Sequence, residues 1–427
     1  MEQFATIPGR MARSAGIAMF LLFAANTQGQ SWEVFDTTSA GFPSNSVTDI
    51  AIDSQDNVWV ATNWGLCKYD GTSWQIFQTS NSGLTDNVVQ CVAVDTLDRV
   101  WIGTLLHGIV VYDGSTRTTY DTQNSGLPDD QIKCITIDHR NWAWVGTYLG
   151  VACYTGSEWR LYDNTPESYN GLVLNGPVIQ DVAVREDGLV AIGTLNGGFH
   201  YLTDTCVQVH GTFIDFFPDN TQVGVAFDPL DNERWIAVPA HGLIRHFDEW
   251  NSGLWFEYST ATSNIPTNSS TCLAMDPLGR PWVGSTYAGI SFRDTDGSFT
   301  NYMSTNSGLP DNTISSLAFA HDGSLWVGTF YGGAARFDQT ALLTEQNGEE
   351  DIEVYPNPTT DVVKVRWPST SGVVMWQLFD QTGRRLGGGV LPTADRSVID
   401  LRGFLPGVYN LRLLSSRSSR LARIIVE

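Results

Sequence analysis

The side chains best suited to ligand binding recur at one position of the sequence, a few residues after a repeated tetrapeptide. Aromatic rings can stack on sugars or on the side chains of a peptide, and amide and imidazole groups can donate and accept hydrogen bonds. The candidate ligand-binding residues at this position are Trp64, His107, Tyr148, Asn196, His241, Tyr287, Phe330 and Tyr331. The alternative, that these residues only cover the ends of the repeated units, stays open from the sequence alone.

No constellation of residues predicts catalysis. The chain has no Gly-x-Ser-x-Gly, His-Glu-x-x-His or phosphate-binding Gly loop, and its seven His are scattered. Residues 294–297 resemble the start of a calcium loop but lack the downstream Glu, so a turn is expected there. One Asp ends a strand in most repeats and is expected to form a turn: Asp53, Asp95, Asp138, Asp228 and Asp276. We expect no catalytic residue, no metal site and no cofactor.

The candidate residues are placed by a long internal repeat. Its tetrapeptide reads Trp, then Val or Ile, then Gly or Ala, then Thr or Ser. The first position falls at Trp59, Trp101, Trp144, Ala191, Trp235, Trp282 and Trp326, which are 42 to 47 residues apart. That period is typical of one four-stranded blade of a β-propeller, so seven copies predict an all-β fold with a seven-bladed propeller over residues 31–340.

Four short strands are expected in each repeat. In the second copy they are predicted at residues 88–95, 100–104, 108–113 and 118–121, separated by Asp and Gly turns. In such a blade, the loop after strand two and the loop into the next strand one share a face, so the candidate residues should gather there. The second loop type adds Leu84, Leu127 and Leu309, and a recurring polar column that could instead cap backbone groups: Asn45, Asn87, Asp130, Asn220, Asn268 and Asn312.

The ends of the array predict how the ring closes. A pattern of Trp, two residues, then Phe or Tyr marks the fourth strand at Trp74 and Trp159. It occurs once more at Trp32, before any first strand, and no comparable strand follows the seventh copy. Residues 31–36 are therefore predicted to complete the last blade and to remove the open sheet edges.

This repeat resembles the two-component-regulator propeller repeat. The resemblance rests on residues 81–84, 100–104, 306–311 and 325–329, and it weakens in repeats four and five, where Ala191 replaces Trp and Ala237 with Val238 replaces Gly-Thr. Propellers of that family often belong to periplasmic sensors ahead of a kinase. Because no kinase or DNA-binding segment is recognisable, a complete signalling receptor is not expected.

The C-terminal part differs from the repeats in composition. Residues 341–352 form a polar, acidic linker, and residues 353–427 contain five or more strand-like runs, which predict a small β-sandwich. Residues 354–358, 378–380, 407–409 and 423–425 resemble the type A sorting domain of type IX secretion. The resemblance implies that the type IX secretion machinery is a partner of this domain and that the protein is secreted or attached to the outer-membrane surface.

Residues 1–30 are typical of a secretory signal peptide. Arg10 and Arg13 precede an apolar stretch at residues 15–25, which is too short to span a bilayer, and small residues follow near a cleavage point at Gly29 and Gln30. No other segment is expected to cross a membrane. No Cys follows the apolar stretch, so lipid attachment at that point is not expected.

Charge and cysteine positions narrow the possible partners. The net charge is −22, and residues 1–352 hold 14 basic and 40 acidic residues, so nucleic acid is not an expected partner. Cys91, Cys134 and Cys272 occupy one small-residue column of three different repeats. Because facing sheets are too far apart for a disulfide, buried free thiols are predicted.

The expected function is that of an exported binding module with a glycan or a peptide as ligand. One alternative is a polysaccharide lyase or glycosidase, with catalytic groups in the central channel near the breaks in the repeat at residues 170–176 and 210–220. A second alternative is an adhesion or structural surface protein without a small ligand. A binding module is favoured over an enzyme because no catalytic motif is present.

Overall fold

The structure is a computed structural model in which residues 31–203, 206–211, 217–229, 234–246, 255–277, 279–294, 297–338, 353–366, 374–379, 385–391, 397–414 and 419–426 are described. Apart from one short 3-10 turn, η1 (Tyr169–Gly171), the described elements are β-strands. The prediction of an all-β chain is therefore confirmed. The expected signal peptide and linker lie outside the described residues.

Residues 31–338 form seven four-stranded antiparallel sheets, which we call blades one to seven in chain order. In blades one to six the four strands follow one another along the chain. Their bounds are β2 (Val47–Ile52), β3 (Val58–Thr62), β4 (Gly65–Tyr69) and β5 (Trp74–Phe77); β6 (Val89–Val94), β7 (Val100–Thr104), β8 (Ile109–Tyr112) and β9 (Arg117–Tyr120); β10 (Ile132–Ile137), β11 (Ala143–Thr147), β12 (Val151–Tyr154) and β13 (Trp159–Tyr162); β14 (Ile179–Val184), β15 (Val190–Thr194), β16 (Phe199–Leu202) and β17 (Val207–His210); β18 (Gly224–Phe227), β19 (Arg234–Val238), β20 (Gly242–His246) and β21 (Trp255–Tyr258); β22 (Ser270–Met275), β23 (Pro281–Ser285), β24 (Ile290–Arg293) and β25 (Phe299–Tyr302).

Blade seven joins the two ends of the array. It consists of β26 (Ile314–Phe319), β27 (Leu325–Thr329), β28 (Ala334–Asp338) and the first strand of the described chain, β1 (Ser31–Phe35). Trp32 lies opposite Phe337 in the β1–β28 ladder, and their rings stack with centroids 4.5 Å apart. The prediction that residues 31–36 complete the last blade is confirmed by this pairing.

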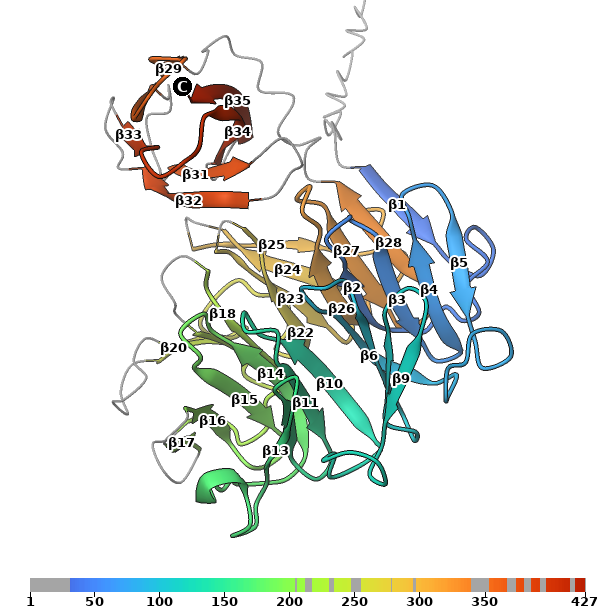
Figure 1. Cartoon of the computed structure of the whole chain (residues 1–427). Coiled ribbons are helices and arrows are strands. Elements are labelled where there is room, and N and C mark those ends of the chain that lie inside the picture. The colour runs from blue at the N-terminus through green and yellow to red at the C-terminus, as the bar shows by residue number, and fades with distance from the viewer. Residues whose placement is uncertain are drawn as a thin grey trace, which may run out of the picture.

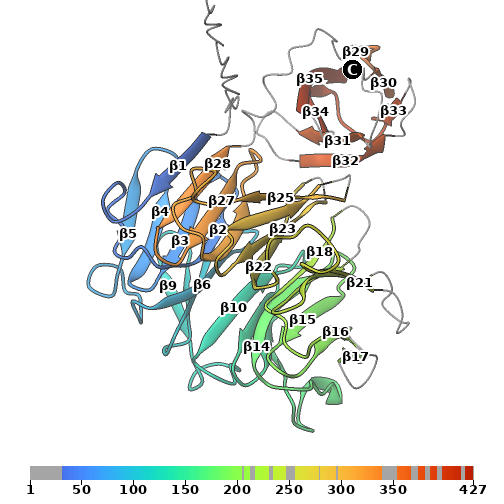
Figure 2. The ribbon, with the colours of Figure 1, turned by 180° about the vertical axis from the view of Figure 1, so that it is seen from behind.

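The first strands of the blades form the inside of the ring (Figures 1 and 2). Each first strand contacts the first strand of the next blade, and β26 of blade seven contacts β2 of blade one. Strand two of every blade is buried along its whole length, because it lies between two strands of its own sheet and between two neighbouring blades. This explains why the apolar tetrapeptide is the strongest repeat signal.

Blade four compensates for its missing tryptophan. Ala191 of β15 lies opposite Tyr201 of β16, and Tyr201 is buried in one cluster with Ala191, Phe199 and Phe217. The aromatic ring that other blades place on strand two is thus supplied from strand three and from the loop before blade five. The repeat weakens in sequence here, but the core remains filled with aromatic side chains.

The C-terminal part contains two further sheets. One has the order β29 (Glu353–Tyr355), β30 (Val362–Arg366), β33 (Ser397–Asp400), and the other has the order β32 (Arg385–Leu391), β31 (Val374–Phe379), β34 (Gly407–Leu414), β35 (Ser419–Val426). Both sheets contribute to one buried cluster, which includes Val363, Ile399, Leu378 and Ile424. The sequence predicted five of these strands but missed β29, which is short, and β32, whose centre is three consecutive glycines.

Ring closure can be tested by removing β1. Deleting residues 31–36 removes the Trp32–Phe337 stack and leaves the edge of β28 unpaired, so we expect the melting temperature to fall by roughly 5–10 °C and the protein to self-associate. Differential scanning calorimetry and size-exclusion chromatography measure these effects. A matched protein that lacks only residues 1–30 is the control, and equal melting temperatures with monomeric elution of both would contradict closure by β1.

Candidate functional site

The tetrapeptide and the strand-ending Asp are joined by a buried hydrogen bond. Trp59 Nε1 donates to Asp53 Oδ2 at 3.2 Å, and Trp101 Nε1 donates to Asp95 Oδ2 at 3.0 Å. The same bond joins Trp144 to Asp138 and Trp282 to Asp276. The other carboxylate oxygen accepts backbone N–H groups of the turn between strands one and two, for example those of Gln55 and Asn57 at Asp53. The expected turn role of these four aspartates is confirmed, and the indole bond is an addition that sequence reasoning missed.

The Thr or Ser that ends the tetrapeptide fixes the loop after strand two. Thr104 Oγ1 donates to the carbonyl oxygen of Gly108 at 2.8 Å and accepts the backbone N–H of His107 at 3.1 Å. Equivalent side-chain bonds close this loop at five further positions: Thr62, Thr147, Thr194, Ser285 and Thr329. The loops that carry the candidate binding residues therefore start from a fixed backbone conformation.

The Gly of the tetrapeptide allows close packing at the centre of the ring. A Cβ atom on Gly103 would lie 2.4 Å from Cys91 Sγ and 2.6 Å from Ile132 Cγ2 of the next blade, both far inside van der Waals contact. Gly146 faces Cys134, and Gly284 faces Cys272, in the same way. The cysteine column is thus a packing position. In blade five the glycine is on strand one and the larger residue is on strand two, since Gly224 lies opposite Ala237.

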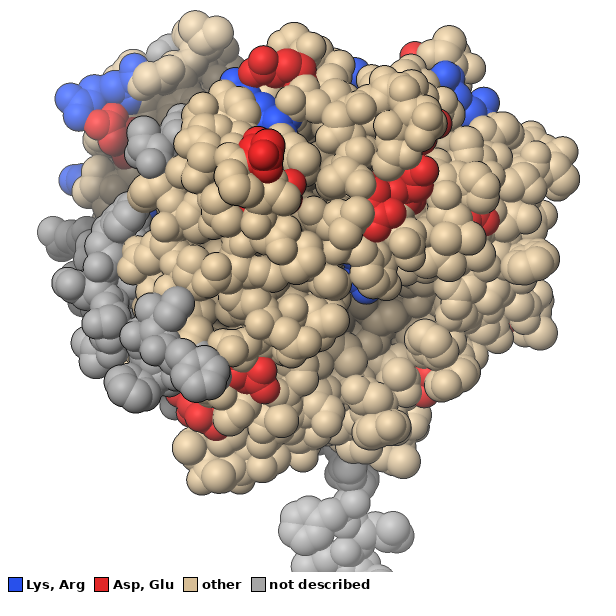
Figure 3. Space-filling model, turned by 90° about the horizontal axis from the view of Figure 1, so that it is seen from below, with Lys and Arg blue, Asp and Glu red and all other residues tan. Residues whose placement is uncertain are grey.

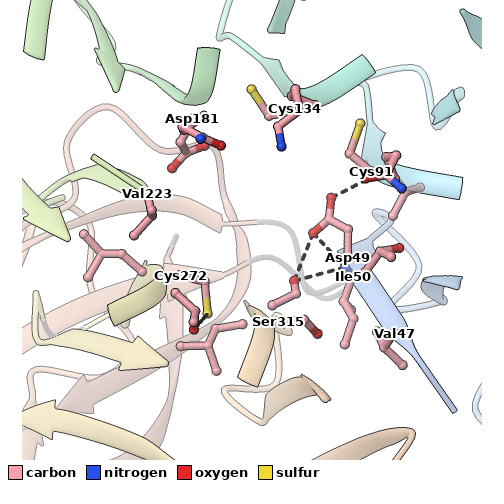
Figure 4. A pocket seen from close by; sticks show the side chains of 18 of the residues that line it. Val47, Asp49, Ile50, Cys91, Cys134, Asp181, Val223, Cys272 and Ser315 are labelled. Carbon is pink, nitrogen blue, oxygen red and sulfur yellow. Dashed lines mark hydrogen bonds between the residues drawn. The ribbon is translucent and has the colours of Figure 1, made fainter. Parts of the chain in front are cut away.

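A cavity of about 510 Å³ lies where the first strands meet. Six first strands and Val223, just before β18, contribute to its lining. Its polar and sulfur-containing groups include Asp49, Lys133, Asp181, Cys91, Cys134 and Cys272. Figure 4 shows the two carboxyls and the three thiols reaching this space from five different blades. The sequence revealed these cysteines as a column but gave no reason to choose Asp49, Asp181 or Lys133.

The two carboxyl groups in the cavity form hydrogen bonds to neighbouring blades. Asp49 accepts the backbone N–H of Val92 in blade two at 3.0 Å and the hydroxyl of Ser316 in blade seven at 2.9 Å. Asp181 of blade four accepts the N–H of Val225 in blade five at 2.8 Å. Burial raises the pKa of Asp49 to about 6 and that of Asp181 to about 7, against the hydrogen bonds, which favour the charged form. Each of these two groups therefore links neighbouring blades at their inner strands.

All six cysteines are free thiols, as the sequence analysis expected. Burial raises the pKa of the Cys91 thiol well above its usual value and raises that of Cys272 to about 12. The pKa of the Cys134 thiol is raised for the same reason. Since the thiolate is the reactive form, we expect these three side chains to be unreactive although they line a cavity.

The structure places all eight candidate binding residues in the loops between strands two and three. Trp64 follows β3, His107 follows β7 and Tyr148 follows β11. Asn196, His241 and Tyr287 follow β15, β19 and β23, and Phe330 and Tyr331 follow β27. Among the candidate Trp, Tyr and Phe residues, Trp64, Tyr287 and Tyr331 are the most exposed, at 57%, 75% and 69% of their surface. The loop positions are as predicted, and ligand binding by these residues stays a prediction.

These residues surround the face rather than converge on one point. Phe330 and Tyr331 contact each other, with ring centroids 4.9 Å apart, and Phe330 also reaches the lining of the central cavity. Three of the others contact neighbours within their own blade or the connection leading into it. His107 lies 3.3 Å from Asp86, His241 lies 3.6 Å from Glu257, and Lys133 lies over the ring of Tyr148.

Sequence reasoning missed three exposed leucines in the same loops. Leu106, Leu149 and Leu195 are each adjacent to a candidate residue and are exposed. Together with Trp64, Tyr287, Phe330 and Tyr331 they place an exposed large hydrophobic side chain on six of the seven blades. We call these seven residues the rim. The sequence signal was available, since each leucine follows the tetrapeptide within two residues.

The loops leading into strand one differ from expectation in part. Leu84, Leu127 and Leu309 lie in these loops, as expected, but their side chains are buried and take no part in an exposed surface. Each is packed into the core between blades, where an apolar residue gains more than at the surface. The recurring polar residues cap backbone groups of these loops, which was the alternative to ligand binding. Asn87 Oδ1 accepts the backbone N–H of Thr79 at 2.8 Å, and the equivalent bond is made by Asn45, Asp130, Asn268 and Asn312.

Comparison with known families identifies both parts of the chain. Residues 41–64 and 308–331 match the family described as two component regulator propeller. Residues 353–427 match the family described as secretion system C-terminal sorting domain. The chain ends in a type IX sorting domain. This sorting domain directs the protein to secretion and the cell surface.

Solved structures similar to this chain support the propeller fold. PorZ, described as an essential bacterial surface component of the type-IX secretion system of Porphyromonas gingivalis, has a TM-score of 0.60 at 18% identity. The extracellular domain described as that of a hybrid two component system from B. thetaiotaomicron has a TM-score of 0.61 at 16% identity. Virginiamycin B lyase from Staphylococcus aureus has a TM-score of 0.57 at 12% identity.

These matches cover different shares of each pair of chains. The match to PorZ covers 92% of this chain and 60% of PorZ, and the match to the two-component domain covers 92% and 57%. The match to the lyase covers 72% of this chain and 99% of the lyase. This chain therefore spans less than two thirds of the first two relatives. At these identities the likeness shows the fold alone. No curated protein matches the sequence.

Two further findings concern all the residues that the structure describes. Among them, no three His, Cys, Asp or Glu side chains gather where they could hold a metal ion. No helix within the described ranges has the length and hydropathy of a membrane span.

The buried carboxyls predict an unusual pH dependence. In the unfolded chain Asp49 and Asp181 ionise near their ordinary pKa of 3.8, whereas in the folded protein they stay protonated until about pH 6 and 7. Their contribution to the free energy of unfolding is therefore complete below about pH 4 and is lost as the pH rises through 6 and 7. One pKa unit corresponds to about 1.4 kcal/mol, so the loss amounts to a few kcal/mol.

We expect Asp49→Asn with Asp181→Asn to flatten this dependence. Between pH 5 and pH 8 the melting temperature of the double variant should fall less than that of the wild type, as measured by calorimetry. His200, whose pKa burial lowers to about 4, acts in the opposite direction but equally in both proteins. Glu167→Gln, at an exposed carboxyl, is the control, and parallel curves for the wild type and the double variant would refute the assignment.

The burial of three thiols predicts that they resist chemical labelling in the folded protein. Cys91, Cys134 and Cys272 should not react with iodoacetamide at pH 7.5 in the folded protein, because their pKa values are raised by burial. All six cysteines should react in denaturant without reductant. Peptide mass spectrometry reads both experiments, and a disulfide-linked peptide in the untreated protein would contradict the free-thiol state.

Proposed function

We propose that this protein is an exported binding module. In this proposal residues 1–30 are a signal peptide, residues 31–340 are a seven-bladed propeller, and a linker at 341–352 leads to a β-sandwich sorting domain at 353–427. The propeller binds a glycan or a peptide through the face formed by the loops after strand two. The sorting domain engages the type IX secretion machinery and brings this face to the outside of the cell.

The observation that carries the proposal is the rim. Ten large hydrophobic residues of the described propeller are well exposed, and seven of them belong to the rim. Exposed hydrophobic side chains lower solubility, and the loops themselves do not need them, because the Thr side chain and backbone bonds already close each loop. Their concentration at one loop position of successive blades favours a binding surface over chance exposure.

The rim is also held rigid. The residue directly after the tetrapeptide donates its backbone N–H to the loop before strand one: Leu105 to Val88 at 3.0 Å, Leu195 to Val178 at 2.9 Å and Phe330 to Thr313 at 3.0 Å. A surface that is ordered before binding loses little conformational entropy when a ligand arrives. This supports recognition of a ligand rather than passive covering of the blade ends.

Charge narrows the class of ligand. The residues before the sorting domain hold 40 acidic and 14 basic residues. Figure 3 shows a hollowed face of the molecule on which most side chains are uncharged and acidic groups lie in separate patches. An acidic polymer would be repelled by this excess of negative charge, so the ligand is expected to be neutral or basic.

Substitutions at the rim test the proposal. Trp64→Ala and Tyr287→Ala each remove an exposed ring, and a stacked ring contributes about 1 kcal/mol, so each variant should bind a ligand several-fold more weakly. The purified exported protein is screened on a glycan array and against a peptide library, and the strongest hit is titrated by calorimetry. Both variants should keep the melting temperature of the wild type.

Leu97→Ala is the matched control. Leu97 is 68% exposed but lies in the turn between β6 and β7, at the opposite end of the blade. It should bind the hit as the wild type does. Normal binding by both rim variants, or equal loss in Leu97→Ala, would exclude the rim as the binding surface.

A further inference from the structure

A second cavity lies in the loops of blade four. Its volume is about 490 Å³, and it shares no lining residue with the central cavity. Its lining includes four amide side chains and an aliphatic patch, represented by Asn164, Asn175, Asn196, Asn220, Val173 and Val209. We call it the blade-four pocket. Only Asn196 was among the candidates from the sequence.

The pocket exists because two loops break the repeat. The connection from strand four to the next strand one has 11 residues in five places, for example residues 78–88 between β5 and β6. Before blade four it has 16 residues, 163–178, and before blade five it has 13, 211–223. Both long connections contribute to the lining, and the strand two–three loop of blade four lies between them. These are the two segments in which the sequence analysis located the breaks.

The wall of the pocket is held from beneath by a buried histidine. Asn175 donates its backbone N–H to Nε2 of His200 at 2.9 Å, and burial lowers the pKa of His200 to about 4, so the imidazole is neutral and can accept this bond at neutral pH. Gly197 packs against the same backbone, since a Cβ on it would lie 1.7 Å from the carbonyl oxygen of Asn175. The amide side chains of Asn175 and Asn196 are thereby positioned on adjoining loops.

The lining has the chemistry of a site for a neutral hydroxyl-rich ligand. It contains no charged residue and no aromatic ring. An amide group can both donate and accept hydrogen bonds, as a sugar hydroxyl does, and Val173 and Val209 offer aliphatic surface to the C–H face of a sugar ring. Leu174 is buried in the core behind this lining, and Asn196 Oδ1 already accepts the hydroxyl of Thr221, which leaves its NH2 group as the donor. Peptides are bound through strand pairing, aromatic grooves or charged ends, and the pocket lining provides neither the aromatic groove nor a counter-charge.

We propose that the blade-four pocket binds a neutral sugar unit. This inference rests on the proposed function, in that it names a glycan as the ligand class and gives it a specific site beside the rim. The pocket breaks the symmetry of the ring, whereas the rim follows it, so the pocket selects the sugar and the rim contacts what is attached to it.

The test uses the exported full chain and defined disaccharides. Cellobiose, maltose and N,N′-diacetylchitobiose are titrated by calorimetry and by saturation-transfer NMR. We expect at least one of them to bind the wild type, and Asn164→Ala with Asn175→Ala to weaken that binding at least tenfold, because two amides that contact the sugar are lost while the backbone bond of residue 175 to His200 remains. The matched control is Asn170→Gly, in the same long loop but outside the lining; Asn170 has a φ of +55°, which glycine adopts without strain.

The outcomes separate this inference from the proposed function. Trp64→Ala should bind the disaccharide as the wild type does, since Trp64 does not line the pocket. Failure of all three sugars to bind, unchanged binding by the double variant, or displacement of the sugar by a neutral peptide would overturn the sugar site. In each of these cases the rim variants still decide independently whether the rim binds a ligand.

Discussion

The close approach of the first two strands at the centre of each blade is the constraint on which the rest of the ring depends. In five blades a glycine on strand two faces strand one, and in blades one and five an alanine takes its place. The first residue of the next blade's inner strand fills the remaining space, as Ile132 does beside Gly103 and Cys91. Larger side chains at this point would push the inner strands apart and change the angle between blades. The packing requirement therefore sets the width of the central cavity and, through it, the distance at which the loops of opposite blades lie.

Two blades meet the same constraint at an energetic cost. Asp49 and Asp181 occupy the small-residue position, where burial disfavours their charged form. Each carboxyl offsets part of that cost by accepting a backbone N–H group of the next blade. A cysteine at this position would form a weaker hydrogen bond, because a thiol is a weak acceptor. Asp49 of blade one accepts the hydroxyl of Ser316 in blade seven, the blade that closes the ring, and Asp181 lies in blade four, where the repeat is least regular.

The fold could be predicted from the sequence wherever one residue type is demanded by geometry in every blade. The tetrapeptide, the strand-ending Asp and the Trp at residue 32 are such positions, and each lies in the predicted element. What could not be predicted depends on the neighbouring blade. Leu84 and Leu127 have the same local sequence environment as an exposed loop residue, and only the blade beside them makes them buried. The lining of the central cavity was missed for the same reason, since each blade contributes a short run of one to four residues and the runs of different blades are far apart in sequence.

The candidate sites differ in how they relate to the repeat, and this difference has a consequence for specificity. The rim recurs with the blade, so a ligand that contacts only the rim could bind in several equivalent rotations, and discrimination between these would be weak. The blade-four pocket occurs once, because the long loops at residues 163–178 and 211–223 occur once. A ligand anchored there has a single orientation on the rim. In the proposed function the contacts with the repeated loops supply most of the binding free energy. The irregular blade four determines which ligand binds and how that ligand is oriented across the face.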